Sequence, residues 1–180
     1  MNNNPARVAQ HSDPEFTLFG RVAAGGVGRV SWPDPPDLHF SLIIADAYTG
    51  ITVIDGQPTL HEAGLRNFGL IKTNIYRNSL PSGVVVRIPL SPAGGMAPQE
   101  FANLILKKAA NFSSYVSPYS APKYIRGSHM RTGEYNSSSY LAGLLRSVMG
   151  YVPAVLTPGY QTPGWETPMP EYFFKGEAIR

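Results

Sequence analysis

The stretch Leu38-His39-Phe40-Ser41-Leu42-Ile43-Ile44-Ala45 decides the fold, because it carries the strongest strand signal in the chain. It is apolar and becomes β-branched towards its end. Residues 46–50 follow as a turn, and residues 51–55 form a second β-branched segment in which Ile and Val alternate with other side chains. Together the two segments predict a β-hairpin.

Further elements extend outward from this hairpin in both directions. Residues 16–22, 68–76 and 83–90 are predicted strands. Pro98 and Glu100 begin a predicted helix over residues 97–110, and a second helix runs from Asn136 to Met149, with Gly150 as its stop. These elements predict an α+β fold, an antiparallel sheet of about four to six strands with two main helices packed on one side.

A length of 180 residues corresponds to one domain. Residues 1–14 are expected to be a flexible leader, residues 15–174 a single domain of catalytic type, and residues 175–180 a tail. The proline-rich segment from Tyr151 onward is expected to lie on the domain as a strap. Its predicted anchors are aromatic: Trp165, Tyr172, Phe173 and Phe174.

Composition excludes several classes of protein. With 43% apolar and 15% charged residues, disorder throughout is excluded, and no run of 18 apolar residues exists to span a membrane. Cysteine is absent, which removes disulfides and thiolate metal sites. The 15 basic residues are scattered and the net charge is only +3, so no nucleic-acid partner is expected. The polar start of the chain is no secretory signal, so we expect a cytoplasmic protein or one exported by a signal-independent route.

Among the four histidines, His39 has the most informative position. It opens the best strand, and a side-chain period of two puts it on one face with Ser41 and Ile43. A histidine held by a strand can serve as a general base, although a half-buried structural histidine is the simpler interpretation. His129 has less weight, because Gly127-Ser128-His129-Met130 matches the scar of a protease-cleavable tag.

The start of the second predicted helix, Glu134-Tyr135-Asn136-Ser137-Ser138-Ser139-Tyr140, is the second candidate. Its first turn has unpaired N–H groups and the positive end of the helix dipole. A nucleophile there is stabilised as an anion, and nearby N–H groups can bind an oxyanion. Helix capping is the competing interpretation, because Asn and Ser are preferred caps.

An early strand histidine followed by a helix start of the form Asn-Ser-x-Ser-aromatic resembles the circularly permuted branch of the papain-like superfamily. Its members are relatives of NlpC-type cell-wall peptidases and of lecithin:retinol acyltransferase. There the nucleophile lies in an Asn-Cys-x-x-aromatic motif, so the resemblance implies His39 as base and Ser137 in the cysteine position. The segment from Pro163 to Pro170 also resembles the tail of uncharacterised bacterial proteins with an Asn-Ser-Asn-Ser-aromatic motif.

The resemblance also implies a third catalytic residue on the strand after the histidine. Asp55 is the first candidate and Gln57 the second, although an ordinary turn is the simpler interpretation of Asp55-Gly56. Oxyanion binding is expected from the segment around the nucleophile, with Asn136, Ser138 and Ser139 as the candidates.

Serine in place of cysteine changes the chemistry, because serine does not form a stable ion pair with histidine and must lose its proton as it attacks. Three interpretations stand side by side. Ser137 is a native serine variant, or it is an inactivating replacement of cysteine, or the site is a dead or binding-only descendant.

The function expected on this basis is a hydrolase or acyltransferase acting on an amide or ester bond, as in a bacterial effector. The implied substrate is a peptide, a glycan-peptide or a lipid, and the implied protein partner is an immunity or delivery protein. A non-catalytic binding or accessory module on the same fold is the alternative.

We expect neither a metal nor a cofactor, because His61-Glu62 lacks a third ligand and Gly25-Gly26-Val27-Gly28 lacks the Lys-Ser/Thr of a phosphate loop. The tyrosines Tyr115, Tyr119 and Tyr124 either line a groove for a sugar or peptide or pack within a loop.

Overall fold

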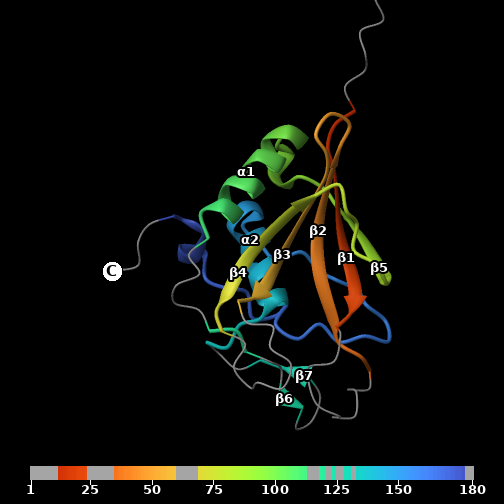
Figure 1. Cartoon of the computed structure of the whole chain (residues 1–180). Helices are drawn as coiled ribbons and strands as arrows, with labels where there is room; N and C mark the ends of the chain where they lie inside the picture. Colours follow the sequence, from red (N-terminus) through yellow and green to blue (C-terminus); the bar gives the residue numbers. More distant parts are fainter. Residues whose placement is uncertain are drawn as a thin grey trace, which may run out of the picture.

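A five-stranded antiparallel sheet lies at the centre of the computed structural model, with its strands in the order β4-β3-β2-β1-β5 (Figure 1). The structure describes residues 12–23, 35–59, 69–112, 118–120, 123–124, 128–130 and 133–176. The strands of the sheet are β1 (Glu15–Val22), β2 (Leu38–Asp46), β3 (Gly50–Pro58), β4 (Ile71–Arg77) and β5 (Val84–Leu90). Strands β2 and β3 form the predicted hairpin.

Both main helices, α1 (Pro98–Ala110) and α2 (Ser137–Met149), lie on one side of the sheet (Figure 1). Gly150 ends α2 in a left-handed conformation, with φ of 80°. The shorter elements are the 3₁₀ turns η1 (Ala93–Gly95) and η2 (Glu171–Phe174) and the two-residue strands β6 (Lys123–Tyr124) and β7 (Ser128–His129). The predicted α+β class, with an antiparallel sheet and two main helices, is therefore confirmed.

The alternation of side chains along β2 divides the molecule into a core and an outer face. Leu38, Phe40 and Leu42 point towards the helices and are fully buried in the main core. His39, Ser41 and Ile43 point to the other face, as the period of two predicts. A smaller apolar cluster covers part of this outer face, and its buried members are Phe19, Ile43 and Val53.

Strands β2 and β3 stop pairing before either strand ends. Their ladder finishes at the Leu42–Ile54 pair, whereas β2 stays paired with β1 as far as Leu38 and β3 stays paired with β4 as far as Pro58. Gln161 from the C-terminal strap lies beside β2 in this region. Its carbonyl oxygen accepts a hydrogen bond of 2.8 Å from the Leu38 N–H group. The sheet is thus open between β2 and β3, where His39, Ser41 and Asp55 lie.

Two expectations were wrong. Asp55 and Gly56 do not form a turn, because β3 continues through them to Pro58. Glycine at position 56 meets a steric need instead: an added Cβ would lie 2.8 Å from Cβ of Tyr140 on α2. In the strap, Trp165, Phe173 and Phe174 are buried as predicted, but Tyr172 is half exposed.

The described residues do not include every segment considered above. His11, His61 and the stretch from Gly25 to Gly28 lie outside them, as do most of the predicted leader and Tyr115. Within the described part of the chain, no helix combines the length and the apolar character needed to cross a membrane.

Candidate active site

His39 and Ser137 meet at the open part of the sheet. Nδ1 of His39 lies 2.8 Å from Oγ of Ser137, although 98 positions separate the two residues in sequence. Ser137 is the first residue of α2 and is 4% exposed, and the side chain of His39 is 16% exposed. The structure therefore brings together the two residues that the sequence singled out as base and nucleophile.

The start of α2 is held by the side chain of Asn136. Its Oδ1 accepts a hydrogen bond of 3.0 Å from the Ser139 N–H group, and its Nδ2 donates one of 2.9 Å to the Pro163 carbonyl. Gly164 packs directly against this cap, with φ of 92° and no room for a Cβ. Capping and nucleophile positioning are thus compatible here, because the cap at Asn136 fixes the backbone from which Ser137 projects.

Asp55 lies on the other side of the imidazole. Its Oδ2 is 3.8 Å from Nε2 of His39, which is too long for a hydrogen bond, and Nε2 is buried with no hydrogen-bond partner among the described atoms. The fully buried carboxylate receives hydrogen bonds from Asn74 Nδ2 at 3.1 Å and from Ser41 Oγ at 3.4 Å. Asp55 is therefore placed to stabilise a positively charged imidazolium. Gln57, the second candidate, lies two residues further along and is paired with Lys72 on β4.

Tyr119 is a site residue whose role the sequence did not reveal. Its hydroxyl lies close enough to Ser137 for the side chain and the backbone of that residue to lower its pKa. Burial raises the pKa of Tyr119, and the proximity of Ser137 offsets this only in part, so the hydroxyl stays protonated at neutral pH. The sequence places Tyr119 in a tyrosine-containing loop, but nothing in it indicates which of these tyrosines reaches the helix start.

The donors available for an oxyanion are fewer than expected. The Ser139 N–H group donates to Asn136, so it is engaged in the cap and is not open to a substrate. The side chains of Ser138 and Ser139 are buried in the molecule rather than exposed at the site. The donors next to the nucleophile are therefore the first-turn N–H groups of Ser137 and Ser138 and the Tyr119 hydroxyl.

Arg21 and Asn74 are two further site residues that the sequence did not indicate. Arg21 lies opposite His39 in the β1–β2 register, with its guanidinium 3.9 Å from Oδ2 of Asp55 and its side chain 34% exposed. Asn74 lies opposite Asp55 in the β3–β4 register. Cross-strand neighbours of this kind follow from the register, which the separate strand signals did not define.

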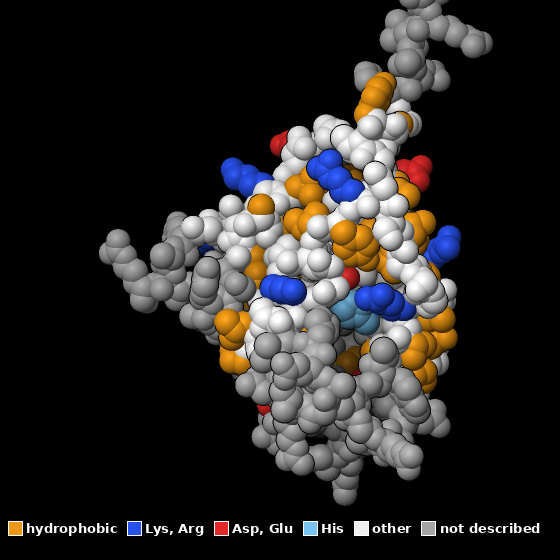
Figure 2. Space-filling view, viewed as in Figure 1, with side chains coloured by type: hydrophobic (Ala, Val, Ile, Leu, Met, Phe, Trp, Pro, Cys, Tyr) orange, Lys and Arg blue, Asp and Glu red, His pale blue; other side chains and the backbone are white. Residues whose placement is uncertain are grey.

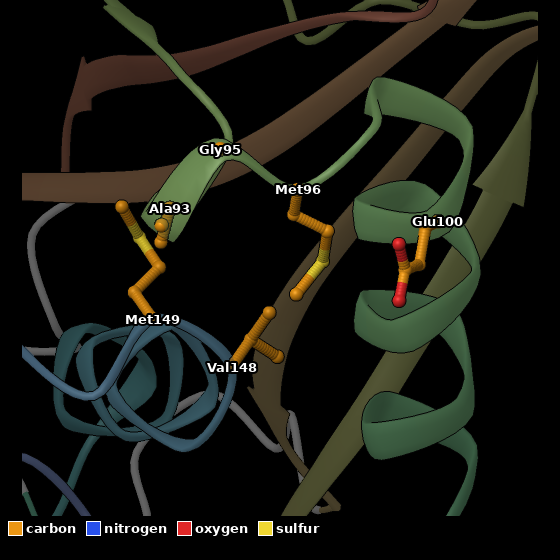
Figure 3. A pocket seen from close by; sticks show the side chains of 7 residues that line it. Ala93, Gly95, Met96, Glu100, Val148 and Met149 are labelled. Atoms are coloured by element: carbon orange, nitrogen blue, oxygen red, sulfur yellow. The ribbon is translucent and has the colours of Figure 1, made fainter.

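A shallow hollow of about 430 Å³ lies at the opposite end of α2. Figure 3 shows Met96, Val148 and Met149 around it, with Glu100 on the neighbouring α1. The last turn of α2 lines this hollow, whereas Ser137 is in the first turn of the same helix. The two turns are about 18 Å apart along the helix axis. This hollow is therefore distinct from the candidate active site. Among the described residues, no three His, Asp or Glu side chains cluster so that they could hold a metal ion.

Comparisons with protein-family models, with curated proteins and with solved structures gave no match for this chain. The identification of the site rests on its own geometry.

Proposed function

We propose that this protein is a hydrolase or acyltransferase that cleaves an amide or ester bond with a Ser137–His39 pair. The observation that carries the proposal is the 2.8 Å separation between Ser137 Oγ and His39 Nδ1. This is hydrogen-bonding distance, and a base has to lie within that distance of the hydroxyl in order to take its proton. The permuted papain-like enzymes that the motif order resembles suggest a cell-wall peptide or a lipid as substrate.

The proposed reaction follows from the arrangement of the groups. Ser137 Oγ attacks the carbonyl carbon while its proton moves to Nδ1 of His39, and the negative charge develops on the carbonyl oxygen. Asp55, 3.8 Å from Nε2, stabilises the imidazolium that forms. His39 then gives its proton to the leaving amine or alcohol, which departs and leaves an ester on Ser137. Water or another hydroxyl or amine, deprotonated by His39, attacks that ester and restores the serine.

Tyr119 and the backbone of Ser137 have the proposed role of oxyanion donors. In the free protein the Tyr119 hydroxyl lies next to the side chain and the backbone of Ser137. A substrate carbonyl oxygen entering between the two residues would accept hydrogen bonds from the Tyr119 hydroxyl and the Ser137 N–H group. Donors fixed in advance in this way are worth about 3–4 kcal/mol of transition-state stabilisation each.

The experiment is labelling with a fluorophosphonate, which modifies an activated serine hydroxyl covalently. We expect labelling of the wild-type protein, loss of labelling in Ser137→Ala, and retention in Ser138→Ala, the matched control one residue further along the same helix. Mass spectrometry of the labelled peptide identifies the modified residue. Equal labelling of wild type and Ser137→Ala would refute Ser137 as the nucleophile.

Burial of Ser137 favours a second candidate function. At 4% exposure the hydroxyl has little contact with solvent in the free protein, which suits a binding or accessory module that retains the fold without turnover. Hydrolysis of 4-nitrophenyl acetate distinguishes the two functions. A rate above background that disappears in both His39→Ala and Ser137→Ala supports the enzyme, and a rate equal to background supports the binding module.

A further inference from the structure

Two basic side chains flank His39 on the outer face of the sheet. Arg21 on β1 is the cross-strand neighbour of His39. On the other side of the opening, the exposed Lys72 on β4 is paired with Gln57 on β3. Alternation places both basic residues on the outer face, because Gly20 faces the core side chains of β2, while Ile71 and Thr73 on either side of Lys72 face the helices. Lys72 is on the edge strand and also borders a hollow with Ala109 and Phe112 at the end of α1. Figure 2 shows a histidine on the surface between two Lys or Arg side chains.

A β-bulge between β1 and β5 lies beside Arg21. Along β1, Gly20 lies opposite Val86 of β5 but Arg21 lies opposite Val84, so Val85 is an extra residue and is exposed. Bulges increase the local twist and change the direction of neighbouring side chains, and they are common beside active sites. The guanidinium stays 3.9 Å from Asp55, beyond hydrogen-bonding distance, while 34% of the side chain is exposed.

Negative charge near this opening comes from two buried carboxylates. Asp55 is fully buried and already receives hydrogen bonds from Asn74 and Ser41, and Asp37, two residues before His39, is 6% exposed. The other acidic residues in β1 to β5, Glu15 and Asp46, lie at the opposite end of the sheet. The exposed charges near His39 in these strands are therefore basic, whereas the carboxylates of Asp37 and Asp55 are buried. Burial, followed by the charge of Asp55, raises the pKa of the nearby Tyr76, whose hydroxyl thus stays protonated and can donate a hydrogen bond.

We infer that the site accepts an amide or ester that carries a free carboxylate a few atoms from the scissile carbonyl, with Arg21 binding the carboxylate and Lys72 adding positive charge. A planar guanidinium pairs with a carboxylate through two parallel hydrogen bonds, which fixes its orientation as well as its charge. Bound beside Arg21, the carboxylate lies one strand away from His39, so the neighbouring carbonyl is brought towards Ser137. This inference rests on the proposed function, because it assigns the substrate class of the same site.

The test measures binding without turnover, so that it is separate from the test of catalysis. The Ser137→Ala protein is titrated by calorimetry with succinanilic acid, an anilide with a free carboxylate, and with the matched neutral diamide. We expect the acid to bind at least about tenfold more tightly than the diamide, with an affinity that falls as salt is added. Equal affinities, or no binding of the acid up to its solubility, would overturn the inference.

Variants identify the groups responsible. In the Ser137→Ala background, Arg21→Gln should remove most of the preference for the acid and Lys72→Gln a smaller part. Arg21→Lys keeps a positive charge beside Asp55 and should retain part of the preference for the acid. This variant therefore distinguishes a loss of carboxylate binding from a loss of folding. Arg77→Gln is the matched control, because Arg77 is an exposed residue at the far end of β4, paired with Thr52. A preference that survives in Arg21→Gln together with Lys72→Gln would contradict the assignment.

Fluorophosphonate labelling of Ser137 without any preference for the acid would leave the proposed function standing and remove this inference alone.

Discussion

Among the described residues, four polar side chains lie next to the carboxylate of Asp55. Asn74 is closest at 3.1 Å, followed by Ser41 at 3.4 Å, His39 at 3.8 Å and Arg21 at 3.9 Å. Only the first two lie within hydrogen-bonding range, so they orient the carboxylate. The effect of Asp55 on His39 therefore depends on residues that touch neither the base nor the nucleophile.

Asn74→Ala tests this positioning role. Loss of a hydrogen bond to a charged group weakens its orientation by about 1.5–3 kcal/mol, so we expect the rate of fluorophosphonate labelling to fall by about tenfold or more. The pH profile of labelling should also change, because Asp55 no longer holds one position beside His39. Asn103→Ala on the exposed side of α1 is the control, and an unchanged pH profile in Asn74→Ala would contradict the positioning role.

Tyr140 gives the protein a sensitivity to alkaline pH. Its side chain is fully buried and its hydroxyl bonds Thr73, and burial raises its pKa far above the ordinary value of 10. The folded state favours the protonated phenol, so its contribution to stability is complete below about pH 10 and is lost as the pH rises above it. Urea unfolding between about pH 8 and pH 11 should therefore show a steep fall in stability for the wild type and a shallower fall for Tyr140→Phe. Parallel curves for the two proteins would contradict this account.

At the scale of elements, the start of α2 depends on a segment that follows the helix in sequence. The Pro163 carbonyl accepts a hydrogen bond from Asn136, and an added Cβ at Gly164 would lie 2.3 Å from Oδ1 of Asn136 and 2.6 Å from Oγ of Ser139. Trp165 then packs on Phe40 of β2, with 5.0 Å between ring centroids, and donates a hydrogen bond to the Pro153 carbonyl. The strap thus connects the capped helix to the strand that carries His39.

Gly164→Ala tests this connection, with Gly159→Ala as the matched control. Both glycines have positive φ, 92° and 80°, but a Cβ at Gly159 meets nothing within 4 Å. We expect Gly159→Ala to lose about 1–2 kcal/mol of unfolding free energy from backbone strain alone. Gly164→Ala should lose about 2 kcal/mol more because it also displaces the cap, and labelling of Ser137 should fall with it. Equal losses in the two variants would show that the contact with Asn136 has no energetic effect.

Most elements could be predicted from the sequence, because their signals are local. The alternation in β2, Pro98 at the start of α1, and Asn136 and Gly150 at the ends of α2 indicate these segments directly. The continuation of β3 through Gly56 could not be predicted, because it depends on contact with Tyr140 from a distant helix.

At the scale of the whole molecule, the C-terminal strap belongs to the main core. Phe174 is fully buried and stacks against Tyr140 of α2 and Phe112 after α1, with ring centroids 5.7 Å and 5.3 Å apart. Its neighbour Tyr172 is half exposed. The aromatic residues near the end of the chain therefore differ sharply in their expected contribution to stability.

Phe174→Ala should cost about 3–5 kcal/mol of unfolding free energy, because it empties a closely packed aromatic site. Tyr172→Ala should cost less than about 1 kcal/mol. Chemical denaturation of the two variants beside the wild type checks both values. A loss in Phe174→Ala no larger than that in Tyr172→Ala would show that the strap does not contribute to the core.

The candidate site was predicted in part. The base, the nucleophile and the acidic neighbour could be chosen because each lies within a recognisable local pattern, and the structure brings His39, Ser137 and Asp55 together. Tyr119 and Arg21 could not be chosen, because their places depend on loop path and strand register.

The 98 positions between His39 and Ser137 have a consequence for synthesis. While the ribosome is still translating the chain, the hairpin of β2 and β3 can form as soon as its residues leave the exit tunnel. The cap of α2 is complete only after Pro163 and Gly164 have also emerged. A nascent chain therefore has its histidine and aspartate long before it has a positioned hydroxyl, so any reactivity of the site is delayed until nearly all of the domain has been made.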